Sequence, residues 1–301
     1  MRVLLFTTLF LSFIVIVLGA YVRLSDAGLG CPDWPGCYGR LTVPESVESS
    51  AVRPLESGKA WKEMTHRYFA GALGLLIFLI ALLSWVQKRQ RFLATLLLGL
   101  VIFQALLGMW TVTLLLHPLI VMGHLLGGFA TLGVLTWMVL PGEKTSPLPT
   151  FVFFALLILL LQISLGGWTS ANYAALSCPD FPTCQGEWWP SLDFKEAFDL
   201  GALGVNYEYG VRGNAGRMTI HLLHRLGAVV TFFLLMGVGL KSALKGAERS
   251  ARFFGAGLAG LVILQFALGV SNVLMFRPLK PNLFVAIFRV HNDPPRALVL
   301  N

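Results

Sequence analysis

The sequence predicts an all-α integral membrane protein made of two tandem four-helix bundles that are related by internal duplication, with a truncated eighth helix. Three observations predict this fold: the composition, apolar runs of membrane-spanning length, and a motif that occurs twice. Of the 301 residues, 56% are hydrophobic and only 13% are charged, whereas soluble chains are about one quarter charged. A transmembrane helix uses about 20 apolar residues, so this composition supplies roughly eight spans.

The same composition excludes a water-soluble enzyme, a disordered chain and a nucleic-acid-binding module. The net charge of +8 is better explained by membrane topology than by binding to nucleic acid, because Lys and Arg set the orientation of membrane helices.

Seven apolar runs reach spanning length, and each predicts a helix because backbone polar groups must be satisfied internally in lipid. The runs cover residues 3–22, 68–86, 92–116, 119–140, 151–169, 222–240 and 253–276. The first run is too long for the apolar part of a signal peptide and has no clear cleavage site before Arg23. It is therefore predicted to be the first membrane span.

Basic residues in two short loops predict the orientation. They are Lys88, Arg89 and Arg91 between the second and third runs, and Lys241, Lys245, Arg249 and Arg252 between the sixth and seventh. Short basic loops face the cytoplasm. The N-terminus is therefore predicted to be cytoplasmic, and the long loops 23–61 and 170–218 to lie on the outer side of the plasma membrane.

The motif Cys-Pro-Asp-[Trp/Phe]-Pro-x-Cys occurs at residues 31–37 and again 147 positions later at 178–184. The match continues with the pair His66-Arg67 against His224-Arg225. Gln104 and the four residues after it match residues 265–269, with offsets that drift to 158 and 161. Insertions in the loops explain this drift. We expect two halves, 1–145 and 146–301, that form a parallel repeat about an axis along the membrane normal.

All four cysteines, Cys31, Cys37, Cys178 and Cys184, lie in the predicted outer loops. An oxidising compartment favours a disulfide within each motif, and the C-x5-C spacing is looser than that of a zinc knuckle. The two rings are either structural or redox-active in at least one half, because small exposed rings tend to be more reducible. The sequence leaves both alternatives open.

Four histidines are expected near the outer ends of the even-numbered spans: His66, His124, His224 and His291. Ionisable groups inside a membrane are costly and usually functional, and neutral imidazole is a ligand of haem iron. We expect one macrocycle in each half, held by His66 with His124 and by His224 with His291. An interhelical hydrogen bond is the alternative for any one of them, and His117 is expected at the surface.

Small residues follow three of these histidines by about one turn, and they are expected either to admit a flat macrocycle or to serve ordinary helix packing. They are Ala70, Gly71, Gly127, Gly128, Gly227 and Ala228.

Glu63 makes the two halves unequal. It lies one turn before His66, and the repeat places His221 at the equivalent position. A carboxylate beside one site favours chemistry in the N-terminal half and electron transfer in the C-terminal half, and the alternative is a solvated residue. Arg67 and Arg225 are expected either to pair with haem propionates or to snorkel toward the interface.

Together these features resemble the haem A synthase family of membrane oxidases over roughly residues 1–280. The most specific parts are the segment 23–37 and the two His-Arg pairs. The resemblance implies an oxidoreductase that converts the C8 methyl group of haem O to a formyl group, which gives haem A for terminal cytochrome oxidases. It also implies contacts with haem O synthase, cytochrome oxidase assembly and a quinol or another electron donor.

Residue roles also come from this resemblance. It implies that His66 and His124, with Glu63 as the catalytic carboxylate, hold the substrate haem O, and that His224 and His291 ligate a haem B cofactor. It further implies that Cys31 and Cys37 are associated with electron delivery, while Cys178 and Cys184 form the second disulfide.

The sequence departs from the family after His291, where Asn292, Asp293 and two prolines are expected to end the eighth span early. Arg289 in the preceding apolar stretch opposes insertion, so the His224–His291 site is expected to be affected.

Three other functions are compatible with parts of the pattern: a di-haem cytochrome that transfers electrons without modifying haem, a membrane thiol–disulfide protein, and a haem-binding copy without turnover. Glu63 favours the enzyme over the cytochrome, and the four histidines are unexplained by thiol chemistry.

Overall fold

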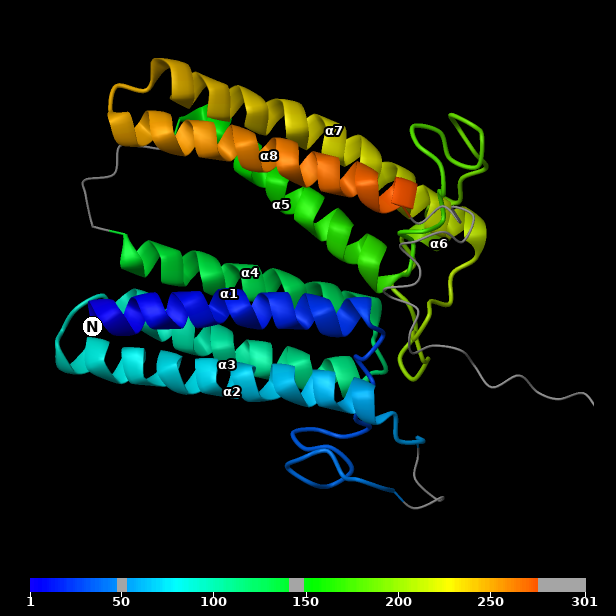
Figure 1. Cartoon of the computed structure of the whole chain (residues 1–301), viewed down its shortest axis with the longest axis horizontal. Coiled ribbons are helices and arrows are strands. Elements are labelled where there is room, and N and C mark those ends of the chain that lie inside the picture. Colours follow the sequence, from blue (N-terminus) through cyan, green and yellow to red (C-terminus); the bar gives the residue numbers. More distant parts are fainter. Residues whose placement is uncertain (48–52, 141–148, 276–301) are drawn as a thin grey trace, which may run out of the picture.

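The computed structural model describes residues 1–47, 53–140 and 149–275, and this part of the chain is helical (Figure 1). Its eight helices, counted over those ranges, are α1 (Arg2–Leu24), α2 (Ser57–Val86), α3 (Arg91–Thr113), α4 (Pro118–Val139), α5 (Thr150–Ala171), α6 (Phe194–Ala197), α7 (Asn214–Lys245) and α8 (Arg249–Met275). Within the described ranges, all except α6 are long and apolar enough to cross a membrane. The chain is therefore a multi-pass membrane protein.

Each of the seven predicted spans coincides with one helix, but α2 and α7 begin well before their apolar runs, at Ser57 and Asn214. Apolarity marks only the part of a helix that lies in lipid. The additional turns are more polar and pack against the long loops, and they carry Glu63 and His221.

Helices α1 to α4 form a closed bundle, in which α1 and α3 each pack against both α2 and α4. Their core is apolar and includes Leu5, Ile77, Leu97 and Leu135. Burial of such side chains stabilises a bundle through close packing, because lipid is as apolar as the core. The first half of the predicted duplication thus has its four helices.

Among the described residues of the second half, α7 packs between α5 and α8, and α5 also packs against α4 of the first bundle. Helices α7 and α8 approach closely where Gly239 faces Gly255 and Ala259, as small residues permit in membranes. The predicted truncated eighth helix, with His291, lies outside the described residues.

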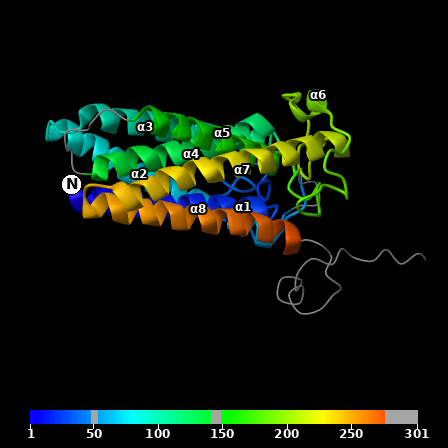
Figure 2. The same ribbon diagram turned by 90° about the horizontal axis from the view of Figure 1, so that it is seen from above.

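Both long loops lie at the same end of the helices (Figures 1 and 2). Part of the second loop, residues 203–212, reaches across to the first bundle, and we call it the strap. Within it, the backbone N–H of Tyr207 donates to the Leu115 carbonyl at 3.0 Å, and Arg53 pairs with Glu208 at 2.7 Å. The strap therefore joins the two halves at the end where both long loops lie.

Candidate functional site

Each predicted disulfide is present in the structure. Cys31 is bonded to Cys37 and Cys178 to Cys184, and all four side chains are buried. A backbone turn follows each ring, in which the N–H of the second cysteine donates to the carbonyl of the residue three positions later, at 2.7 Å for Cys37 and 2.8 Å for Cys184. The prediction of one disulfide within each motif is confirmed.

The aspartate of each motif holds the turn that follows the ring. Asp180 accepts hydrogen bonds from the backbone N–H groups of Gln185 at 2.6 Å and Gly186 at 2.9 Å, and from the Thr183 hydroxyl. Burial alone would raise the pKa of Asp180, but the hydrogen bonds outweigh it and lower the pKa to about 2. Asp33 holds the first ring in the same way.

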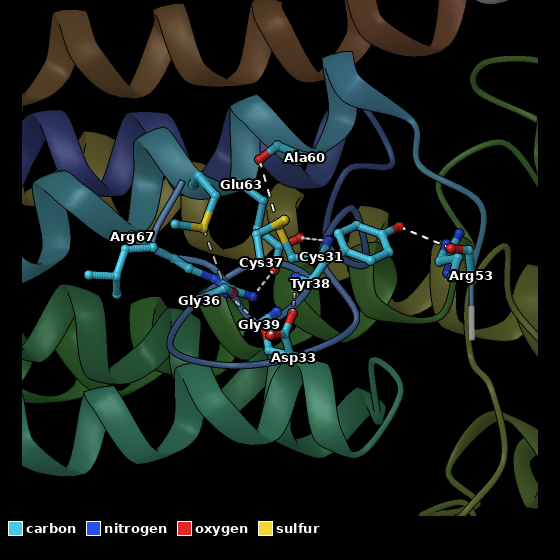
Figure 3. Close-up of a disulfide and its surroundings, with 12 residues drawn as sticks. Cys31, Asp33, Gly36, Cys37, Tyr38, Gly39, Arg53, Ala60, Glu63 and Arg67 are labelled. Carbon is cyan, nitrogen blue, oxygen red and sulfur yellow. Dashed lines mark hydrogen bonds and ion pairs between the residues drawn. A yellow bond between two sulfur atoms is a disulfide. The ribbon is translucent and has the colours of Figure 1, made fainter. Parts of the chain in front are cut away.

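Arg67 and Arg225 bind the disulfide rings. Arg67 donates to the backbone carbonyls of Asp33 at 2.9 Å and Gly36 (Figure 3), and Arg225 donates to those of Cys178 at 2.8 Å and Thr183 at 2.9 Å. Each arginine thus ties a ring to the helix that carries a candidate ligand. Pairing of the arginines with propionates stays a prediction, and snorkelling does not describe their contacts.

Glu63 is only 4% exposed, so the alternative that it is a solvated residue is wrong. Its carboxylate accepts a hydrogen bond from the Cys31 backbone N–H at 2.9 Å and pairs with Arg67 at 2.5 Å (Figure 3). The first ring, the carboxylate and the arginine therefore form one connected unit. In the second half, His221 takes the place of the carboxylate and lies 3.2 Å from Nε of Arg225.

His66 on α2 and His124 on α4 face each other across the first bundle, with ring centroids 6.5 Å apart and ring planes at 84°. The Nδ1 atoms of both rings are buried without a hydrogen-bond partner in the described part of the chain. Among the same residues, no cluster of three or more His, Cys, Asp or Glu side chains can hold a metal ion. The two rings therefore offer one pair of imidazoles.

These two imidazoles would suit a haem iron, because the macrocycle would supply the remaining ligands of that iron. With a metal–nitrogen bond of about 2 Å on each side and the radius of each ring, two imidazoles on one metal have centroids roughly 6 Å apart. The observed separation is of this size. The relation of His224 to His291 lies outside the described residues.

Glycines of neighbouring helices provide flat surfaces for the three described rings. A Cβ added at Gly19 would lie 3.0 Å from Cε1 of His66, and one at Gly166 would lie 3.2 Å from Cε1 of His224. Gly108 has the same relation to His124, at 3.3 Å. The repeat contained this signal, since Gly19 and Gly166 match, but the sequence did not indicate which side chain each glycine faces.

Glutamine side chains fill the space beside two of the glycines that the sequence offers as contact points for a macrocycle. The Gln104 side chain occupies the space beside Gly127 and donates to the His124 carbonyl at 2.8 Å, and Gln162 occupies the space beside Gly227. An added Cβ at either glycine would collide with a glutamine Oε1. Their small size therefore serves helix packing, which was the alternative prediction.

The prediction that His117 lies at the surface is wrong. It is only 6% exposed, and its ring packs edge-to-face against Tyr207 of the strap, with centroids 5.3 Å apart. The contact was not predictable because it comes from a loop of the other half of the chain.

The family model described as "Cytochrome oxidase assembly protein" (COX15-CtaA) matches residues 2–284. The chain is 42% identical over 293 residues to a protein of Shewanella oneidensis named heme A synthase, with 90% of this chain and 87% of the relative covered. A heme A synthase of Shouchella clausii is 27% identical, with 87% and 83% covered. One of Mesorhizobium japonicum is 25% identical, with 91% and 82% covered.

Proposed function

Because the chain belongs to the cytochrome oxidase assembly protein family (COX15-CtaA), we propose that it is a haem A synthase, an oxidoreductase that converts the C8 methyl group of haem O to a formyl group. The observation that carries this proposal is the facing pair His66 and His124 with the buried carboxylate of Glu63 one turn away on α2. The named relatives support the same activity.

In this proposal, the N-terminal half, residues 1–145, binds haem O through His66 and His124. An iron macrocycle supplies the redox chemistry that side chains alone lack for oxidising an unactivated methyl group. The protein contributes two imidazoles fixed against Gly19 and Gly108. Rigid ligands of this kind hold a substrate in one orientation, which is a large part of catalysis.

Glu63 places a carboxylate that is paired with Arg67 beside this site. The Cys31 N–H and Arg67 hold its two oxygens in place, so the carboxylate needs no reorganisation when charge develops nearby. Buried and preorganised charges act more strongly than charges in water. Through the same contacts, Glu63 connects the site with the Cys31–Cys37 ring, which we propose is the place of electron delivery.

The C-terminal half, residues 146–301, is proposed to hold a haem B cofactor through His224 and His291. His221 stands there in place of a carboxylate, and it is held by Arg225. This half therefore has no counterpart of the Glu63 charge at that position and is suited to electron transfer. A quinol or another donor supplies the electrons.

The location follows from the basic short loops. We propose that the protein lies in the plasma membrane with a cytoplasmic N-terminus and with both disulfide rings on the outer side. Haem O synthase is the proposed source of substrate, and the product serves cytochrome oxidase assembly.

The proposal is tested by expressing the chain with a haem O synthase and separating the extracted haems by chromatography. We expect haem A with the wild-type chain and its loss with His66→Ala, Glu63→Ala and Glu63→Gln. Glu248→Ala removes an exposed carboxylate next to α8 and is the matched control, which keeps haem A. Bound haem B without haem A in a well-expressed wild-type protein would indicate a di-haem cytochrome and overturn the proposal.

A further inference from the structure

We propose that both disulfide rings rest in the membrane surface, with exposed aromatic and apolar side chains of each ring inserted among the lipid headgroups. The partner of this surface is lipid. Lipid contact at the rings does not depend on the proposed function, because it requires only that the helices cross a membrane. It concerns the end of the helices where both long loops lie.

Each ring carries large apolar side chains that are exposed. Trp34 is 40% exposed, and Phe181, which follows it by 147 positions, is 39% exposed. Leu41 and its counterpart Trp188 are 77% and 67% exposed, and Trp189 is exposed as well. Exposed apolar patches on a folded protein mark contacts with a membrane or with another protein. Because the exposure recurs at equivalent positions of both halves, it belongs to the repeated ring and not to one loop.

The exposed residues of the first ring lie beside the point where α2 enters the apolar part of its sequence. Arg67 donates to the ring carbonyls, and the next residue, Tyr68, donates its hydroxyl to the Leu41 carbonyl at 2.6 Å. Tyr68 is itself exposed and is the first residue of the apolar run 68–86. Figure 1 shows the first loop alongside this end of α2. Leu41 is therefore next to a surface that faces lipid.

The second ring has the same relation to α7. Arg225 donates to two of its carbonyls, and the guanidinium carbon lies 5.8 Å from the centre of the Phe181 ring. The next residue of α7, Leu226, is exposed and belongs to the apolar run 222–240. The exposed side chains of both rings are thus continuous with the lipid-facing surface of a membrane-spanning helix.

The side chains on the rings are of the kinds that favour the boundary between lipid and water. Tryptophan has an apolar body and one N–H donor, and it is enriched where membrane proteins meet the headgroups. Trp34, Trp188 and Trp189 supply such side chains, while Leu41 and Phe181 supply further apolar contact. A surface of this composition is suited to the headgroup region and not to the water above it.

The charges beside these residues separate lipid from a protein as the partner. Arg40 is exposed next to Leu41, whereas its counterpart 147 positions later is the exposed acid Glu187. Protein partners are selected by complementary charge, so one protein would not match both rings. The lipid interface selects aromatic and apolar side chains, which is the feature that both rings share.

An anchored first ring fixes the depth of the residues that are bound to it. The Cys31 N–H donates to Glu63, and Arg67 binds both Glu63 and the ring. His66 follows Glu63 by three residues, which is about 5 Å along a helix axis. Contact of the ring with lipid therefore holds this carboxylate, and the imidazole beyond it, at the edge of the membrane.

The experiment uses the full-length chain in nanodiscs of phosphatidylcholine that carries bromine either near the headgroups or near the chain ends. Bromine quenches the fluorescence of the tryptophans that it contacts. Trp188→Phe combined with Trp189→Phe removes the indoles of the second ring, so the fluorescence lost in this variant is theirs. We expect this component to be quenched several-fold more by the shallow bromine than by the deep bromine. Trp34→Phe tests the first ring in the same way.

Two other tryptophans calibrate the measurement. Trp137 is exposed on the membrane-spanning helix α4, and Trp137→Phe should remove a component that brominated lipid quenches. Trp168 is buried, and Trp168→Phe should remove a component that neither lipid quenches. If the component of Trp188 and Trp189 behaves like that of Trp168, the second ring does not touch lipid and the proposal is wrong.

Charged substitutions test whether these side chains anchor the ring. Trp188→Glu combined with Trp189→Glu places two carboxylates at the surface, where transfer of charge out of water is costly. We expect the second ring to leave the surface and a water-soluble phosphine to reduce Cys178–Cys184 several-fold faster in nanodiscs, with Cys31–Cys37 unchanged. The two Phe substitutions serve as the control and keep the wild-type rate. Equal rates with Glu and with Phe would contradict anchoring by these side chains.

Discussion

The imidazole rings of the site lie against bare backbone, so small changes on the neighbouring helices reach them directly. Gly108 on α3 lies against the His124 ring, and an added Cβ would lie 3.3 Å from Cε1 of the ring. Interiors are packed too densely to absorb such a contact without a shift. The position of the His124 ring is therefore set by a residue that is not itself a ligand.

Gly108→Ala is expected to displace the His124 ring by a few tenths of an ångström and to reduce haem retention in the N-terminal half about tenfold, as changes in supporting contacts of metal ligands do. The haem-to-protein ratio of the purified protein measures this. Gly99→Ala lies on the same helix, where no described atom lies within 4 Å of the added Cβ, and it serves as the control. Equal haem content in the two variants would contradict the role given to Gly108.

Asp180 predicts an acid dependence of stability. Its pKa is about 2 in the folded protein against an ordinary 3.8, so the folded state favours the ionised form. The resulting stabilisation is complete above about pH 4 and is lost as the pH falls from 3.8 through 2.

Asp180→Asn removes the charge that accepts hydrogen bonds from Thr183, Gln185 and Gly186. It should lower the free energy of unfolding by about 1–3 kcal/mol at pH 6. Denaturant unfolding in detergent at pH 6 and at pH 2 measures the difference between the variant and wild type. We expect the difference to shrink at the lower pH. A difference that is the same at both pH values would show that the carboxylate charge is not responsible.

At the scale of the elements, α2 and α7 are longer than their apolar runs because their first turns pack against the disulfide rings. The runs indicated where the helices cross the membrane, since lipid selects apolar side chains there. They could not indicate that the helices begin at Ser57 and Asn214. The polar part of each helix is held by an arginine, Arg67 or Arg225, that donates to loop carbonyls. Contacts of this kind between distant segments leave no periodic signal in the sequence.

The arginine contacts predict how each disulfide responds to a reductant. Arg67→Leu removes the hydrogen bonds that hold the first ring on α2, so the Cys31–Cys37 bond should become several-fold more accessible to a dithiol. Alkylation followed by mass spectrometry measures the rate for each ring separately.

Arg225→Leu supplies the matched comparison, because it should accelerate reduction of Cys178–Cys184 and leave the first ring unchanged. If either variant accelerates the reduction of both disulfides, the cause is general unfolding instead of local release of one ring.

For the whole molecule, the duplication predicted the architecture well because repeated residues carry repeated contacts. Asp33 and Asp180 hold equivalent turns, and Gly19 and Gly166 face equivalent histidines. The strap was not predictable, since Tyr207 and Glu208 lie between residues 186 and 224, where the offset of the repeat changes from 147 to 158 and the two halves no longer match. His117 was misplaced for the same reason.

The strap and the shared contact between α4 and α5 join two bundles whose sites differ in a few residues. Among the described residues, Glu63 against His221 and Val15 against Gln162 are two of these differences. We propose that the duplicated scaffold supports one half for chemistry and one half for electron transfer, with His66 and His124 together holding the iron of haem O.

Electron paramagnetic resonance of the haem O-loaded protein tests this claim most directly, in a His224→Ala background that leaves only the N-terminal site. The ring planes of His66 and His124 are nearly perpendicular, at 84°, so we predict the strongly anisotropic low-spin ferric signal of two perpendicular imidazoles. His124→Ala should convert it to a high-spin signal. A low-spin signal that persists unchanged in His124→Ala would contradict the proposed pair of ligands.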